Sequence, residues 1–111
     1  MSATRLEVAC YGPTKAVLST GLNAATRARY WIAEVYYERQ RAAATQLVTI
    51  VGSDGAQPSF ETLAQTDGIR HCLWLDHSCI ELPPASWMAL KAWADDVMQD
   101  APSRTSEALP A

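Results

Sequence analysis

The first regular pattern is an alternation of apolar and polar residues over residues 5–10, where Leu6, Val8 and Cys10 lie on one side. A period of two is typical of a strand with one buried face. Residues 46–52 differ, because apolar residues follow one another almost without a break and several are β-branched. Such a run predicts a central strand covered on both faces. The sequence thus predicts strands over 5–10 and 46–52.

Residues 69–82 predict a β-hairpin, with strands over 69–76 and 79–82. A tight turn at His77-Ser78 places the aliphatic residues of the hairpin opposite one another, as the pairs Leu75–Ile80 and Leu73–Leu82. One side of the hairpin is then aliphatic and faces the core. The opposite side carries Cys72, Trp74, Asp76, Cys79 and Glu81.

A helix is predicted from the Pro83-Pro84 pair to near residue 99, because the fixed φ of proline suits the first turn of a helix. Apolar residues then recur at three- and four-residue steps, the spacing of one helix face: Trp87, Leu90, Ala94 and Val97. We expect Trp87 and Leu90 to pack on the aliphatic side of the hairpin. Residues 101–111 are small, polar and interrupted by proline, so we expect a disordered tail there.

Residues 23–44 fit two patterns. As a helix capped by Asn23, the segment has a single apolar stripe, formed by Ala28, Trp31, Ile32, Val35 and Tyr36. As a strand, it is rich in the aromatic and β-branched residues that favour strands, but polar and apolar side chains then mix on both faces. We give the periodicity more weight and predict a helix, with the strand as the alternative.

Two shorter segments complete the predicted fold. Residues 14–20 fit either a short helix or a second strand. Ser59 is a typical N-cap for a short helix over residues 60–65. Together the elements predict an α+β fold, with a small, mainly antiparallel sheet of three to five strands and two or three helices packed on one face. We expect residues 1–100 to form a single domain.

The composition predicts a folded, cytoplasmic, bacterial protein. The chain has 111 residues, of which 49% are hydrophobic and 19% charged, as expected for one globular domain. We expect neither a secretory signal nor a membrane span, because no apolar segment is long enough. Three cysteines without regular spacing fit free thiols in a reducing compartment. Arg outnumbers Lys, which is a habit of GC-rich bacterial genomes.

The net charge of −3 argues against a nucleic-acid partner, because phosphate contacts favour a basic surface. Residues 13–32 nevertheless look like a helix-turn-helix, with Gly21 in the turn. Thr26, Arg27 and Arg29 are then the DNA-binding residues. The resemblance fails at position 27, where such motifs bury an aliphatic side chain. DNA binding is therefore the alternative interpretation.

No catalytic, metal or cofactor motif stands out. His71, Cys72, His77 and Cys79 are of metal-ligand types, but their spacing is not that of zinc sites and the predicted hairpin separates them. The glycines of residues 52–55 lack the lysine of a phosphate-binding loop. We expect no metal, no cofactor and no enzymatic activity. A small enzyme is the third interpretation, with its acids and bases sought among Glu34, His71 and Asp76.

Aromatic residues are the main functional signal. Four Trp and four Tyr stand against one Phe, and Tyr30, Tyr37 and Trp74 fall outside the predicted apolar stripes. Tyr and Trp are common in protein interfaces. Further candidates lie where carboxylates oppose the dipole of the predicted helix: Asp95, Asp96 and Asp100.

These residues predict a non-enzymatic accessory or regulatory protein that binds another protein, or itself as a homodimer. Phages, plasmids and gene cassettes carry small proteins of this kind, so we expect a mobile genetic element as the source.

Overall fold

The computed structural model describes the backbone of residues 4–37 and 45–108, and side chains within residues 4–37 and 47–99. Its strands are β1 (Thr4–Ala9), β2 (Thr14–Leu22), β3 (Arg29–Tyr37), β4 (Thr45–Val51), β5 (Ser59–Gln65), β6 (Gly68–Leu75) and β7 (Ser78–Leu82), and its helix is α1 (Pro84–Ala108). The strands form two antiparallel sheets, β1-β2-β3-β4 and β5-β6-β7. The predicted α+β class is confirmed, but two sheets replace the predicted single sheet. One helix occurs in the described residues, where two or three were predicted.

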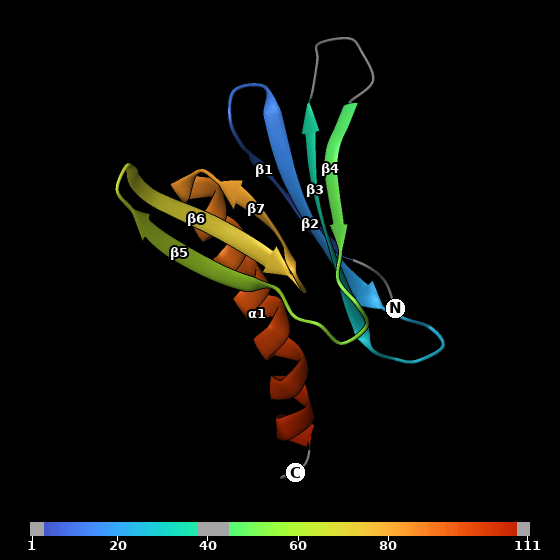
Figure 1. Ribbon diagram of the computed structural model, residues 1–111. Helices are drawn as coiled ribbons and strands as arrows, with labels where there is room; N and C mark the ends of the chain where they lie inside the picture. Colours follow the sequence, from blue (N-terminus) through green and yellow to red (C-terminus); the bar gives the residue numbers. More distant parts are fainter. Residues whose placement is uncertain (1–3, 38–44, 109–111) are drawn as a thin grey trace.

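Figure 1 shows the two sheets diverging from the region where β4 leads into β5, while α1 runs beside the smaller sheet and projects beyond both. α1 contacts β1 and β6, so it bridges the two sheets. One cluster of buried side chains joins all three layers: Ala16, Leu18, Trp31, Ala33, Leu73, Leu75, Ile80, Leu82, Leu90 and Ala94. The limits of the domain, predicted as residues 1–100, stay a prediction.

Residues 14–37 form the β2–β3 hairpin, so the helix predicted over 23–44 is wrong for its described part; residues 38–44 lie outside the described residues. Alternation explains the outcome. Trp31 and Ala33 are fully buried on one face of β3, whereas Glu34 and Tyr36 share the other face, where the Tyr36 hydroxyl donates to Glu34 (2.9 Å). Pairing with strands on both sides satisfies the backbone of β3, and its aromatic and β-branched residues suit a sheet.

The hairpin predicted over 69–82 is confirmed as β6–β7, but its turn lies at Asp76-His77, one residue earlier than predicted. Leu73 therefore faces Ile80, and Leu75 faces Ser78. The partner of each residue has moved by two positions. Because side chains alternate with a period of two, the four aliphatic residues still share the buried face.

α1 begins at Pro84, as predicted, and continues to Ala108, beyond the predicted end near residue 99. Leu90 has no exposed surface and lies in one cluster with the hairpin leucines, so the predicted packing is confirmed. Trp87 packs on the same cluster, and its indole donates to the Cys72 carbonyl (2.9 Å). The disordered tail predicted for residues 101–111 stays a prediction; residues 109–111 lie outside the described part. No described helix is long and apolar enough to cross a membrane.

Two segments take positions that the sequence patterns did not predict. Residues 60–65, predicted as a short helix, belong to β5, which pairs with β6 at the edge of the smaller sheet. β4 was predicted as a central strand covered on both faces, but it is the outer strand of the larger sheet. In this outer position, β4 leaves Leu47, Val48 and Val51 exposed.

Candidate functional site

The aromatic residues proposed for partner binding do not form one surface. Tyr30 and Tyr37 lie at opposite ends of β3, and Trp74 lies on the other sheet. Each is half-buried rather than exposed. Tyr30 covers Gly21, its cross-strand partner, and Trp74 donates its indole N–H to Glu61 (2.9 Å). Two of these rings are therefore engaged in contacts within their own sheets.

The acidic residues predicted to lie at the end of the helix lie within α1, which continues to Ala108, and they form a weaker patch than the sequence predicts. Asp95 is paired with Lys91 one helical turn away (3.1 Å), which neutralises part of its charge. Asp96 is exposed. The side chain of Asp100 lies outside the described residues. The described acids therefore do not form a concentrated negative surface.

The helix-turn-helix over residues 13–32 is not present, because these residues form β2, the start of β3 and the turn between them. The Thr26 hydroxyl donates to Asp54 (3.3 Å), and Arg27 has a left-handed φ of 65° in the turn. Arg29 starts β3 and donates to the Thr20 hydroxyl (3.1 Å). The three residues predicted to bind DNA thus lie in the connection between β2 and β3 or at the start of β3, and not on a recognition helix.

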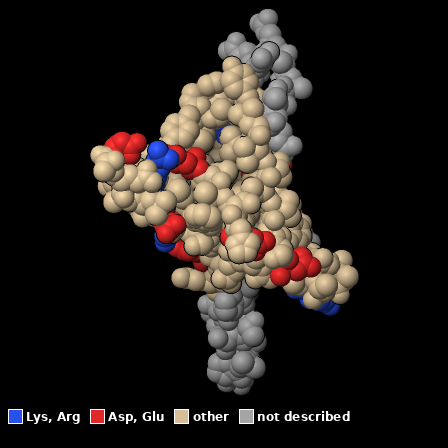
Figure 2. Space-filling model, in the orientation of Figure 1, with Lys and Arg blue, Asp and Glu red and all other residues tan. Residues whose placement is uncertain are grey.

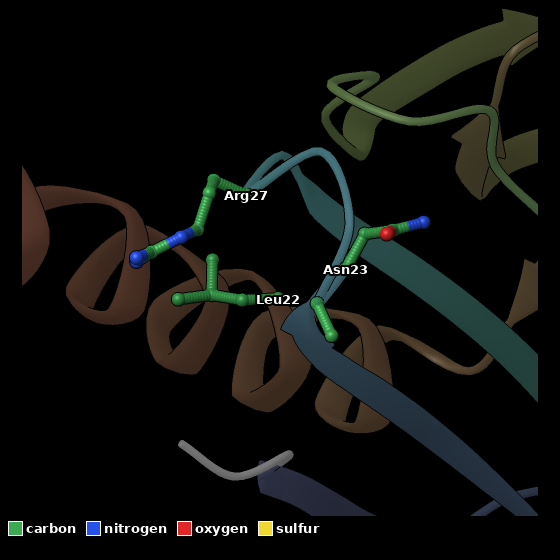
Figure 3. Close-up of a pocket in the computed structure, with 4 residues that line it drawn as sticks. Leu22, Asn23 and Arg27 are labelled. Atoms are coloured by element: carbon green, nitrogen blue, oxygen red, sulfur yellow. The ribbon is translucent and has the colours of Figure 1, made fainter.

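A shallow, open pocket of about 300 Å³ lies on this turn, lined by Leu22, Asn23, Ala24 and Arg27. Figure 3 shows Leu22 and Arg27 projecting to one side of the turn, while Asn23 projects to the other. The Asn23 side chain is occupied: its oxygen accepts from the Ala25 and Thr26 N–H groups, and its amide donates to Asp54. Arg27 is thus the one charged group of the lining, which is a sparse set of contacts for a specific ligand.

The three residues considered for a small enzyme lie in separate places. Glu34 accepts from Tyr36 on the outer face of the larger sheet. His71 lies on the inner face of the smaller sheet, with its ring 5.0 Å from that of Trp87. Asp76 lies in the β6–β7 turn and accepts from the Ser53 N–H (2.8 Å) and hydroxyl. No acid–base pair results from this arrangement.

The residues of metal-ligand types are also kept apart. Cys72 and Cys79 occupy the outer face of the β6–β7 hairpin, opposite the His71 face, and His77 lies in the turn. The described residues include no group of three or more potential metal ligands. Burial raises the pKa of the Cys72 thiol, and the neighbouring Cys79 and Glu81 raise it further. A raised pKa keeps this thiol protonated and makes it a poor nucleophile at neutral pH.

β4 carries the largest exposed apolar set on any one described strand. Val51 is 63% exposed, Leu47 53% and Val48 39%. Its residues, TQLVTIV, include no charged side chain. Figure 2 shows that acids and bases lie in small, scattered groups on the visible face, with broad uncharged areas between them. The other three outer strands each carry at least one charged residue: Arg5 and Glu7 in β1, Glu61 in β5 and Glu81 in β7.

The backbone of β4 is also open toward solvent. The Gly52 N–H donates to the Trp31 carbonyl (2.9 Å). Hydrogen-bonded and non-bonded pairs alternate along an antiparallel ladder, so Ile50 and Val48, which face Ala33 and Val35, direct their backbone groups to β3. The N–H and C=O groups of the intervening Thr49 and Val51 therefore point away from the sheet, where another strand can accept and donate hydrogen bonds.

A β-bulge shapes the first part of this strand. The register shifts between Val35 and Tyr36, which face Val48 and Gln46, so Leu47 is the extra residue. A bulge is one of the devices that bend an outer strand, but here it leaves an apolar side chain exposed. The regular part of the strand, from Val48 to Val51, remains suited to pairing.

The sequence pattern located β4 but not its role. A continuous apolar run predicts burial on both faces, whereas this run is only partly covered. The one signal that distinguishes β4 from the other outer strands is its complete lack of charged residues, because charge is one of the usual protections of a sheet edge.

Comparison of the chain with protein-family models, with curated proteins and with solved structures finds no match.

Proposed function

We propose that this chain is a non-enzymatic accessory or regulatory protein that acts by binding another protein chain at β4. The observation that carries the proposal is the outer position of β4, with outward backbone groups at Thr49 and Val51 and exposed apolar side chains at Leu47, Val48 and Val51. Addition of an extended segment to an open strand is a common mode of protein recognition.

Two features explain how such an edge gives both affinity and selectivity. The backbone groups supply hydrogen bonds that do not depend on the partner's sequence. The side chains of β4 alternate between the two faces of the sheet, with Val48 and Ile50 on the Ala33 face and Thr49 and Val51 on the Glu34 face. A partner strand therefore meets apolar side chains on both faces, and the proposal predicts an apolar, β-branched partner segment.

The free thiols at Cys10, Cys72 and Cys79 suit the reducing, cytoplasmic setting that we assign to this function. The scattered positions of Glu34, His71 and Asp76 support a binding role over a catalytic one.

The test is affinity purification with a tagged chain from the native host, quantified by mass spectrometry. Val51→Lys places a charge on the open edge, whereas Ile69→Lys makes the same change at an equally exposed apolar residue, 64% against 63%, on the smaller sheet. We expect Val51→Lys to reduce recovery of the partner about tenfold, which corresponds to roughly 1.4 kcal/mol. Ile69→Lys leaves recovery unchanged. Equal recovery with both variants contradicts binding at β4.

A further inference from the structure

The apolar residues of β4 are arranged symmetrically about Thr49, so two antiparallel copies of the strand can match each other. If two copies of β4 lie antiparallel about an axis through Thr49, Val48 of each copy faces Ile50 of the other within the regular part of the strand, and Leu47, the bulge residue, comes next to Val51. Thr49 then faces its own counterpart. Leu47 and Val51 are the two most exposed apolar residues of the strand, at 53% and 63%, so this register covers the side chains that the single chain leaves open.

The backbone allows the same register. An outward-pointing residue must face another outward-pointing residue for the two strands to exchange hydrogen bonds. Thr49 and Val51 point outward, as argued from the Gly52–Trp31 hydrogen bond. An axis at Thr49 pairs Thr49 with itself, so its N–H and C=O groups meet their complements in the second copy.

Neighbouring registers match the side chains less well. An axis at Val48 places Leu47 opposite Thr49 and Ile50 opposite Gln46, so apolar residues face polar ones. An axis at Ile50 places Val51 opposite Thr49 and Val48 opposite Gly52. Only the axis at Thr49 pairs every apolar residue of 47–51 with another apolar residue, and apolar cross-strand pairs stabilise a sheet by about 0.2–1 kcal/mol each.

The absence of charge on β4 allows a second copy as the occupant. Two like charges directly opposite each other destabilise a strand pair, and a residue that lies on the twofold axis faces its own copy. β4 avoids this cost in every register because it has no charged residue, whereas β1, β5 and β7 each carry at least one. The register that pairs the apolar side chains of β4 is therefore free of charge repulsion within the strand pair.

We propose that two copies of this chain associate through antiparallel β4 strands about an axis at Thr49, which joins their four-stranded sheets into one continuous sheet. This inference rests on the proposed function and names the first partner of the β4 edge. Stable interfaces bury about 1,200–2,000 Å², and one pair of short strands lies below that range. We therefore expect a weak dimer that forms at micromolar or higher concentration.

The first test is the oligomeric state of the purified full chain by sedimentation velocity, over concentrations from about 1 μM to 1 mM. We expect the mass to rise from one to two chains across this range. Val51→Lys should remain a monomer throughout, with an unchanged circular dichroism spectrum, and Ile69→Lys should associate like the wild type. A monomeric wild type at every concentration, or a Val51→Lys variant that still dimerises, overturns the proposal.

The second test locates the axis by disulfide cross-linking in a Cys79→Ser background, which removes the exposed native thiol. Thr49→Cys places two thiols on residues about 5.5 Å apart at Cα, within the range for a disulfide. Val48→Cys is the matched control, because an axis at Thr49 separates its two copies by about 8 Å. Efficient cross-linking at residue 49 alone supports the register, and preferential cross-linking at residue 48 overturns it.

The two proposals fail separately. A wild-type chain that is monomeric, but whose captured partner is lost on Val51→Lys, removes the self-pairing and leaves partner binding at β4 in place. A chain that dimerises through β4 and captures no other protein confirms the self-pairing and limits the function to self-association.

Discussion

β1 and β4 are the two outer strands of the same sheet, yet they present opposite surfaces. β1 carries Arg5 and Glu7, which form an ion pair (2.7 Å), and α1 lies against it, with the Ser86 hydroxyl donating to the Ala9 carbonyl. β4 has neither a charge nor a covering helix among its described contacts. Charge and cover are two of the devices that prevent outer strands from pairing, so this molecule protects one edge and leaves the other open.

The two strands pair and pack in the same way, so whether an edge is open depends on the side chains and the helix beside that one strand. Both strands pair antiparallel with a central neighbour and both contribute partly buried residues to one core, including Leu6, Val8 and Ile50. What separates them is the side chains that face solvent and the position of α1. Substitutions that change each of these features in turn test the comparison.

Loosening the packing of the helix that lies against β1 is expected to change stability most. Leu90 has no exposed surface and belongs to the cluster that joins α1 to both sheets. Leu90→Ala should lower the free energy of unfolding by about 2–5 kcal/mol, because it leaves a cavity, as measured by urea unfolding. Met88→Ala, at a residue 62% exposed on the same helix, is the control and should change stability by less than about 0.5 kcal/mol.

A methyl group added inside the sheet should lower the stability of the chain more than a lysine placed at the open edge. A Cβ on Gly21 falls 2.6 Å from the Tyr30 hydroxyl. Gly21→Ala should therefore cost about 1–3 kcal/mol through overpacking, whereas Val51→Lys should change the stability of the single chain by less than about 0.5 kcal/mol.

A double-mutant cycle checks this cause. Gly21→Ala should cost less when Tyr30 is also replaced by alanine, because the ring that opposes the new methyl group is gone. Equal costs in the two backgrounds contradict the contact as the cause.

Neutralising β1 should make it resemble β4. Arg5→Thr combined with Glu7→Thr removes both charges without changing the net charge, and the loss of this exposed ion pair should cost at most about 1 kcal/mol. α1 still lies against β1 in this variant, so the experiment separates charge from cover. If charge is the deciding protection, each chain pairs on both sides of its sheet and light scattering detects species larger than a dimer, whereas association like that of the wild type shows that α1 is enough to protect β1.

The control removes an ion pair of the smaller sheet. Asp67→Thr with Arg70→Thr deletes the pair at 3.6 Å, again with no change in net charge. This variant should associate like the wild type. If it aggregates as strongly as the β1 variant, loss of charge in general is responsible and the edge itself is not.

The smallest expected effect is on the pKa of Tyr36, which lies on β3, a central strand between the charged edge strand β1 and the neutral edge strand β4. The hydrogen bond to Glu34, followed by slight burial, raises the pKa of Tyr36 above its ordinary value of 10.0. Folding thus favours the protonated phenol, so its stabilising effect is complete below pH 10 and is lost as the pH rises through the raised pKa.

Ultraviolet titration of the tyrosines measures this shift. Glu34→Gln should move one tyrosine transition to lower pH, because the negative acceptor is removed, and Tyr36→Phe should abolish that same transition. A Glu34→Gln titration curve identical to that of the wild type contradicts the assigned cause.

Residue patterns alone were enough to predict the elements for which a single kind of secondary structure fits. α1 follows from proline at residues 83 and 84 and from the apolar steps from Trp87 to Val97. For the 69–82 hairpin the predicted turn was one residue too late, but the predicted buried face was still right, because the register moved by two residues. For β3, by contrast, a helix period and a strand period fit the same residues, and the choice depended on β2 and β4 as neighbours on either side.

The tertiary structure alone decided which strands are outer strands. The apolar run of β4 satisfies the pattern of a covered strand, and nothing within residues 45–51 states how many neighbours the strand will have. Strand order follows from which chain segments pair across the whole sheet, a non-local property that local composition does not encode. The candidate site therefore emerged only when β4 was found at the edge, although its neutral, β-branched residues were visible in the sequence from the start.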